Sequence, residues 1–97
     1  MEIFVRRTPF KFEWDSEKSE ANLEKHGVTF LDATEVFFDP LVQFLSAEPV
    51  DTEDRSIAIG RNISLNILLV VHTERDDHIR IISARPPTRH ERRLYEA

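Results

Sequence analysis

The sequence contains no cysteine and only two glycines among its 97 residues. Without cysteine, the chain can form neither a disulfide framework nor a thiolate metal site. Two glycines are too few for the glycine-rich loops that cradle nucleotide phosphates. No apolar run approaches the roughly 20 residues of a membrane span, and the first residues lack the pattern of a signal peptide. We therefore expect one small cytoplasmic domain with a single modest core and no membrane contact.

The net charge of -5 conceals two halves of opposite sign. Residues 1–54 carry 13 acidic and 5 basic side chains, which gives -8, whereas residues 55–97 carry 5 acidic and 8 basic side chains, which gives +3. All eight basic residues of the second half are arginine. Arginine suits phosphate contacts because its guanidinium is planar and always charged. The second half thus indicates contact with nucleic acid, although few phosphates could be neutralised and free binding should be weak.

The N-terminal third predicts a strand and then a helix. We expect residues 1–11 to be a loose lead-in, because they show no clear period. Residues 10–14 alternate apolar and charged side chains, which predicts a half-buried strand. Asp15 is a suitable N-cap for a helix over 16–26, and Gly27 is a natural residue to end that helix.

The rest of the chain predicts an α+β fold that ends in a helix. The expected elements are a second helix, four strands and a final helix, at residues 29–39, 41–45, 55–62, 66–74, 78–85 and 88–96. Thr88 and Glu91 have the spacing of a capping box at the start of the last helix. Residues 75–77 read as a hairpin turn and residues 46–54 as an acidic loop. The predicted order is β-α-α-β-β-β-β-α with an antiparallel meander.

Five arginines lie on or at the ends of adjacent predicted strands. They are Arg55, Arg61, Arg75, Arg80 and Arg85. Strand alternation predicts that Arg80 and Arg85 point to opposite faces, so that the five cannot all line one cleft. An alternative stays open, in which Arg80 and Arg85 make ion pairs within the domain, with Glu13, Asp15 or Asp39 as partners.

The arginines are suited to RNA cleavage without a metal. Such a reaction needs a 2′-hydroxyl aligned with the phosphorus and positive charge that stabilises the pentacoordinate phosphorane, which guanidinium groups can supply in a partly desolvated cleft. The base could be a histidine, a glutamate or even a perturbed cation.

The histidines give little support for a metal site. No pair has the i, i+4 helical spacing of a metalloprotease. His72 and His78 could approach each other across the predicted hairpin, but two histidines that face solvent are the simpler interpretation.

Trp14 is the only tryptophan and has two possible roles. It could be a platform on which an RNA base stacks. A tryptophan at the end of a strand is more often a core or rim residue.

Motifs along nearly the whole chain resemble one family, the BrnT toxins. The resemblance begins near residue 12, so we expect a single domain over 12–97 with residues 1–11 as an N-terminal extension. The motifs include Phe12-Glu13-Trp14-Asp15, Lys25-His26-Gly27-Val28-Thr29-Phe30, Asp39-Pro40 and Arg80-Ile81-Ile82-Ser83-Ala84-Arg85. This chain departs from the family in its turn at 75–78, which lacks the usual glycine, and in its acidity.

The resemblance implies a RelE-like ribonuclease toxin of a type II toxin–antitoxin pair. Such a toxin has helices packed on one side of an antiparallel sheet and cuts RNA without a metal or cofactor. Its partner is a ribbon–helix–helix antitoxin similar to BrnA, through which the complex reaches operator DNA. The predicted catalytic residues are Arg55, Arg75 and Arg85, and the predicted RNA-binding residues are Trp14, Arg61 and Arg80. The alternative is a non-catalytic module that binds the antitoxin and acts as a co-repressor.

Overall fold

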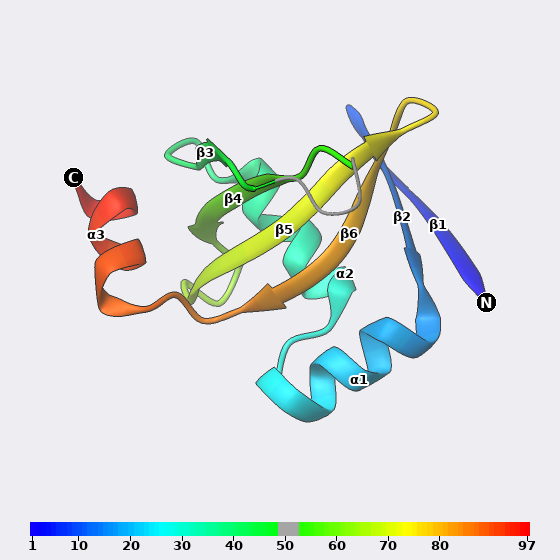
Figure 1. Ribbon diagram of the computed structural model, residues 1–97, viewed down its shortest axis with the longest axis horizontal. Helices are drawn as coiled ribbons and strands as arrows, with labels where there is room; N and C mark the ends of the chain where they lie inside the picture. The colour runs from blue at the N-terminus through cyan, green and yellow to red at the C-terminus, as the bar shows by residue number, and fades with distance from the viewer. Residues whose placement is uncertain (49–52) are drawn as a thin grey trace.

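A computed structural model of the chain describes residues 1–48 and 53–97. Within them, one six-stranded sheet carries helices on both of its faces (Figure 1). The elements are β1 (Glu2–Arg7), β2 (Phe10–Asp15), α1 (Ser16–His26), α2 (Phe30–Ala33), the 3-10 helix η1 (Thr34–Phe38), β3 (Gln43–Ser46), β4 (Ser56–Arg61), β5 (Ile67–Arg75), β6 (His78–Arg85) and α3 (Arg89–Glu96). The strand order across the sheet is β1-β2-β6-β5-β4-β3. The acidic loop predicted at 46–54 lies partly outside the described residues.

The predicted helix ends of α1 and α3 are confirmed. The Asp15 carboxylate accepts a hydrogen bond from the amide of Lys18 at 3.1 Å, and α1 ends at Gly27 with a φ of 73°. Thr88 and Glu91 form a reciprocal capping box at the start of α3. Local capping chemistry thus sets these boundaries, as it does in isolated helices. No helix among the residues described is long and apolar enough to cross a membrane.

The second predicted helix is only partly correct. A short α-helical turn, α2, passes directly into the tighter η1. The Thr34 hydroxyl donates to the Leu31 carbonyl at 2.6 Å, so it bonds back to the preceding turn. The β-branched and aromatic residues of η1 also have low helix propensity. Packing therefore stabilises this segment more than its intrinsic preference does.

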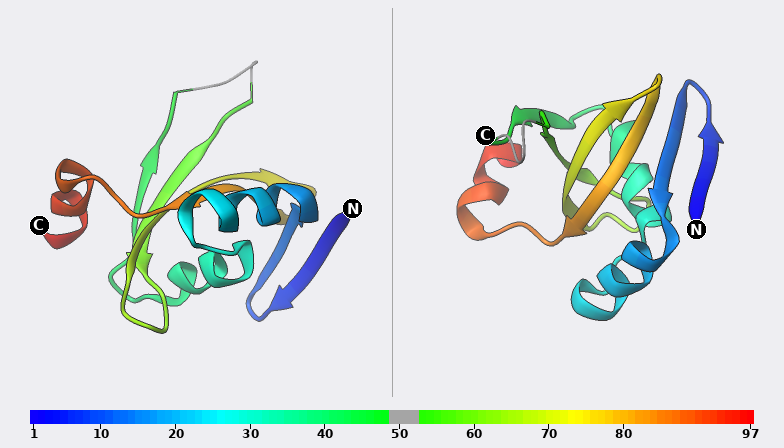
Figure 2. Two further views of the ribbon diagram at one scale, coloured as in Figure 1. Left: turned by 90° about the horizontal axis from the view of Figure 1, so that it is seen from below. Right: turned by 45° about the vertical axis from the view of Figure 1, so that its right-hand side comes forward.

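The prediction of a loose lead-in is wrong, because β1 is a regular strand. β1 pairs with β2 in antiparallel register along its whole length. Ile3 and Val5 pack against the core, opposite Trp14 and Phe12 respectively. Their alternation with exposed residues is a strand pattern that is too short to stand out in the sequence. The N-terminal segment is thus an edge strand of the sheet, and Figure 2 shows it beyond β2.

The sheet is mixed and not purely antiparallel as predicted. β2 and β6 are neighbours that run parallel, with Phe12 beside Ile79 and Glu13 beside Arg80. The long connection through α1, α2 and three strands returns β6 to the sheet in the same direction as β2. The sequence pattern predicts where the strands lie but not their order in the sheet, because β2 and β6 are far apart in the sequence.

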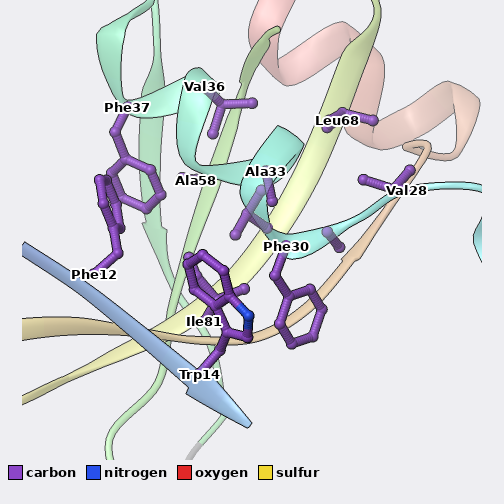
Figure 3. Packing of buried hydrophobic residues seen from close by; sticks show 12 residues of the cluster. Phe12, Trp14, Val28, Phe30, Ala33, Val36, Phe37, Ala58, Leu68 and Ile81 are labelled. Atoms are coloured by element: carbon purple, nitrogen blue, oxygen red, sulfur yellow. The ribbon is translucent and has the colours of Figure 1, made fainter. Parts of the chain in front are cut away.

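The main core lies between the sheet and the layer formed by α1, α2 and η1 (Figure 3). Phe12, Phe30 and Val36 are fully buried there. Asn22 fastens α1 to β6, because its side chain donates to the carbonyls of Val28 and Ala84 at 2.8 Å and accepts from the Ala84 amide at 3.1 Å. This face of the sheet is therefore closed.

The prediction that the helices pack on one side is wrong for α3. Tyr95 of α3 belongs to a second, smaller cluster with Ile59, Ile67 and Leu69. These strand residues point away from the main core, because Ala58, Leu68 and Val70 alternate with them and lie in it. Leu94 and Tyr95 are the only large apolar residues of α3, so one aromatic side chain is enough to seat it on the second face.

Candidate functional site

A bulge in β6 brings the arginines to one face of the sheet. Arg80 pairs with Thr73 and Arg85 pairs with Leu69, but the register shifts between these two pairs. Val71 faces Ser83 and His72 faces Ile81, which leaves Ile82 as an additional residue. One additional residue reverses the alternation that follows it.

The prediction that Arg80 and Arg85 point to opposite faces is therefore wrong. Ile81 and Ala84 both enter the main core, and the two arginines point to the other side. Arg61 and Arg75 pair with Ile67 and His78 and lie on that same side, and so does Arg55, which precedes β4 by one residue. We call this surface the arginine face. It carries Arg55, Arg61, Arg75, Arg80 and Arg85.

The arginines divide into two groups on this face. One group lines a hollow of about 220 Å³ that we call the cationic hollow. Its lining consists of Lys18, Glu53, Arg55, Arg75, Arg80, Ile81 and Ile82. The other group, Arg61 and Arg85, lies near α3. Arg85 is opposite Leu69 and Arg80 is opposite Thr73, so roughly 13 Å of strand separates them.

Among the arginines of the hollow, Arg55 and Arg75 are the least engaged within the described part of the protein. Among the described residues, Arg55 forms one ion pair, of 3.5 Å, between its Nη2 and a carboxylate oxygen of Glu53. The Nε of Arg55 is buried and has no hydrogen-bond acceptor among residues 1–48 and 53–97. Arg75 is exposed, and none of the described carboxylates forms a salt bridge with it. Both guanidinium groups can thus bind an incoming anion without losing a strong partner.

Arg80 is held by two carboxylates. It pairs with both oxygens of Glu2, and its Nη1 lies 3.0 Å from Oε2 of Glu13. The hydrogen bond to Glu2 is the main reason why the pKa of Arg80 is raised further above its ordinary value. The ion pair with Glu13 confirms one of the alternatives for Arg80. Glu2 was missed because residues 1–11 were expected to be loose.

Arg85 forms a bidentate ion pair with Glu91. The two Nη atoms lie 2.7 and 2.9 Å from the carboxylate oxygens, and the same carboxylate accepts from the Thr88 amide at 2.8 Å. The hydrogen bond from Arg85 is the main cause that lowers the pKa of Glu91 to about 2. An ion pair was foreseen for Arg85, but with other partners. The capping box at Glu91 was the sequence signal for this one.

Arg61 contacts α3 and not the cationic hollow. Its guanidinium lies 5.5 Å from the centroid of the Tyr95 ring, and the Tyr95 hydroxyl donates to Oδ2 of Asp39 at 2.5 Å. Burial alone would raise the pKa of Asp39, but hydrogen bonds from Tyr95 and from the amides of Arg61 and Leu41 outweigh it, so this pKa is lowered. The charged carboxylate of Asp39 thus accepts hydrogen bonds from α3, from β4 and from the turn that precedes β3.

Trp14 is a core residue in this structure. Its side chain is only 5% exposed and meets Phe30 edge-on, with the ring centroids 6.4 Å apart (Figure 3). It lies on the helix-covered face, opposite to the arginine face. A base that stacks needs a ring open to solvent. The core interpretation of Trp14 therefore fits, and its position here offers no surface for RNA.

His72 and His78 do not approach each other, because they lie on opposite faces. His72 pairs with Ile81 and His78 with Arg75. The interpretation that both face solvent is wrong for His72, which is buried with its ring centroid 5.0 Å from that of Phe37. Burial lowers the pKa of His72 to about 4, so the ring is neutral at pH 7. Over the described part of the chain, no three histidine or carboxylate side chains converge as metal ligands would.

Comparison with known proteins gives the chain a family. Residues 14–91 match the family described as the ribonuclease toxin BrnT of a type II toxin–antitoxin system. The fold is similar to the crystal structure of the ribonuclease toxin BrnT of Brucella abortus, with 28% sequence identity and a TM-score of 0.61. The similarity covers 78% of this chain and 94% of that one. No curated protein sequence matches. Because the family match spans most of the chain, including every strand of the meander and all five arginines, the chain belongs to the BrnT family of ribonuclease toxins of type II toxin–antitoxin systems.

Proposed function

We propose that this toxin cleaves RNA without a metal and that the reaction takes place at the cationic hollow. The observation that carries the proposal is the convergence of Arg55 and Arg75 in one hollow, with few internal partners. Guanidinium groups fixed in a partly buried site stabilise charge that develops in a transition state. Family membership supports ribonuclease activity.

The proposed chemistry is an internal transesterification. The 2′-hydroxyl oxygen forms a bond to the adjacent phosphorus while the bond from phosphorus to the 5′-oxygen breaks. The proton of the 2′-hydroxyl passes to a base, and the leaving 5′-oxygen takes up a proton from water. Arg55 and Arg75 stabilise the two negative charges of the phosphorane. Glu53 is the carboxylate that lines the hollow, so we assign it the role of base.

Arg85, Arg61 and Arg80 have different places in the proposal. Glu91 already neutralises the charge of Arg85, so this guanidinium attracts a phosphate strongly only if the RNA replaces Glu91 as its partner. Measured along the strands, Arg85 lies roughly 13 Å from Arg80 of the hollow and Arg61 lies roughly 20 Å from Arg55, so a substrate that meets both groups has to extend over several nucleotides. Arg80 lines the hollow, but its donors are largely occupied by carboxylates.

We further propose that the fold is RelE-like and that the neutralising antitoxin is a ribbon–helix–helix DNA-binding protein. A type II system includes a protein antitoxin, and this family belongs to such systems. The toxin has a net charge of -5, which disfavours direct binding to operator DNA. Contact with DNA is therefore assigned to the antitoxin.

A non-catalytic, antitoxin-binding role is the second candidate. The observation in its favour is that two of the five arginines, Arg80 and Arg85, are already neutralised by internal carboxylates. Expression without the antitoxin separates the candidates. The ribonuclease arrests growth, and Arg75→Ala abolishes the arrest, whereas a non-catalytic module leaves growth unchanged in both forms.

The direct test is cleavage of a defined single-stranded RNA in excess EDTA. Wild type should cut the RNA and leave a 2′,3′-cyclic phosphate, while Arg75→Ala should be much slower. Arg93→Ala is the matched control, because Arg93 is exposed on α3 and away from the hollow. Loss of all cleavage in EDTA would overturn the metal-free mechanism.

A further inference from the structure

Glu2 binds Arg80, a lining residue of the cationic hollow, from a strand that the family match does not include. The match begins at residue 14, whereas β1 ends at Arg7. β1 is nevertheless continuous with the arginine face, because Phe4 pairs with Glu13 and Glu13 lies beside Arg80. Figure 2 shows β1 as the strand on the outer side of β2. The carboxylate of Glu2 thus arrives from the edge of the sheet.

Glu2 occupies N–H donors of Arg80 that could otherwise bind a phosphate. A guanidinium has five N–H donors. One Nη1 donor and one Nη2 donor of Arg80 bond to Glu2, and the other Nη1 donor bonds to Glu13. Only the Nε donor and one Nη2 donor remain. These two donors can still contact a phosphate, but the cluster of Arg80 with Glu2 and Glu13 carries a net charge of -1. A phosphate is therefore repelled from Arg80 unless one carboxylate leaves.

The two carboxylates differ in how easily they can leave. The side chain of Glu13 is 7% exposed, so separating it from Arg80 would leave a buried and unpaired charge. The side chain of Glu2 is 43% exposed and can return to water. Glu2 is therefore the exchangeable partner, and Glu13 is the fixed one.

We propose that Glu2 is a positioning residue that competes with the RNA phosphate for Arg80 and so restrains substrate binding by this toxin. This inference rests on the proposed function, in which the phosphate enters the hollow beside Arg55 and Arg75. Glu2 acts through Arg80 on binding and does not touch the reacting atoms. Its removal should strengthen binding, and the rate of the bound complex should not rise.

The test compares Glu2→Gln with wild type and with Glu24→Gln. Gln keeps the size of Glu2, and the backbone ladder of β1 is unaffected, so we expect the variant to fold. Glu24 is an exposed carboxylate on α1 and serves as the matched control for loss of one negative charge. Binding of a labelled oligonucleotide with 2′-O-methyl sugars, which cannot be cleaved, is measured against salt concentration.

Glu2→Gln should bind this probe roughly fivefold more tightly at 0.1 M salt, since one more phosphate contact steepens the salt dependence by about 0.7. In cleavage, KM should fall by a similar factor with kcat unchanged. Glu24→Gln should behave as wild type, and Glu2→Asp, which keeps the charge, should lie between wild type and Glu2→Gln.

Two results would overturn the inference. One is equal tightening by Glu2→Gln and Glu24→Gln, which would show a general charge effect. The other is weaker binding by folded Glu2→Gln, which would show that Glu2 aligns Arg80 for the substrate. Absence of cleavage by wild type would reject the proposed function alone, because the probe reports on Arg80 without any reaction.

Discussion

At the two ends of the arginine face, the arginine side chains differ in how strongly other residues of the protein hold them. At the cationic hollow, Arg75 is exposed and Arg55 forms a long ion pair with Glu53. At the α3 end, Arg85 is saturated by Glu91, and Arg61 lies over Tyr95. An arginine held closely by a carboxylate stabilises the fold, whereas an arginine with a long ion pair or none is available to an anion. Arg80, which Glu2 and Glu13 hold, is the exception within the hollow. We therefore infer that the arginines of the hollow act on the substrate and that the arginines at the α3 end stabilise the fold.

The proposed base gives the largest expected effect. Glu53→Gln should lower kcat by about 10²–10⁴, the usual contribution of general base catalysis. Binding of RNA should not weaken, because the change removes a negative charge from the hollow. A wild-type kcat in folded Glu53→Gln would place the base elsewhere.

Arg75→Ala should lower kcat by roughly 10²–10³, the cost of one lost donor to a developing oxyanion. The unfolding free energy should stay within about 0.5 kcal/mol of wild type, because Arg75 has no salt bridge with the described carboxylates. Cleavage assays and urea denaturation give the two quantities. Arg75→Lys should restore only part of the rate, because the planar fork is lost. A large loss of stability would remove the contrast between the two ends.

Arg85→Ala should lower stability more, and the rate of cleavage less, than Arg75→Ala does. The change leaves Glu91 without its bidentate partner and should cost about 1–2 kcal/mol of stability. Its effect on cleavage should be nearer tenfold, since a phosphate has to compete with Glu91 for this guanidinium. Cleavage and denaturation are measured on the same preparations. A loss of rate as large as that of Arg75→Ala, at unchanged stability, would make Arg85 catalytic in the full sense.

The bulge explains why the sequence could not predict how the arginines are arranged. Alternation along β6 is a local rule, and it put Arg80 and Arg85 on opposite faces. The additional residue, Ile82, becomes visible only when β6 is paired with β5. Two adjacent apolar residues, Ile81 and Ile82, were the one local sign of it. The existence of the strand could be predicted, but its effective period could not.

The same distinction holds for the rest of the fold. The caps at Asp15, Gly27 and Thr88 depend on neighbours within four residues, and they could be predicted. The parallel pairing of β2 with β6 and the packing of α3 on the sheet depend on contacts between segments that are distant in the sequence, so they could not be predicted. The ion pair of Arg80 with Glu2 depends on the pairing of β1 with β2, and it was missed because residues 1–11 were expected to be loose.

Acid should destabilise the α3 end through Glu91. The pKa of Glu91 is about 2 in the folded protein and 4.5 as the ordinary value. Its stabilising contribution is therefore complete above pH 4.5 and is lost as the pH falls toward 2. Allowing for solvent screening of this partly exposed pair, we expect about 1–2 kcal/mol.

Thermal unfolding between pH 7 and pH 2 measures this contribution. Glu91→Gln should be less stable than wild type at pH 7 and approach it at the acid end. Glu96→Gln is the control, because Glu96 forms an exposed i, i+4 pair with Arg92 that should contribute little. A constant difference between wild type and Glu91→Gln at every pH would contradict the assignment.

Tyr95→Phe should affect stability and leave RNA cleavage unchanged. The change removes one hydrogen bond to Asp39, while the amides of Arg61 and Leu41 still donate to that carboxylate. The ring keeps its packing against Ile59 and Leu69. The loss of a single hydrogen bond to a charged acceptor should cost about 1–2 kcal/mol of stability, and each kcal/mol should lower the Tm by roughly 4–8 °C.

RNA cleavage by Tyr95→Phe at a temperature well below the Tm should equal that of wild type, because neither Tyr95 nor Asp39 lines the cationic hollow. A variant with unchanged Tm and lost cleavage would reverse the assignment, since it would show that the Tyr95 hydroxyl, and with it the α3 end, takes part in the reaction.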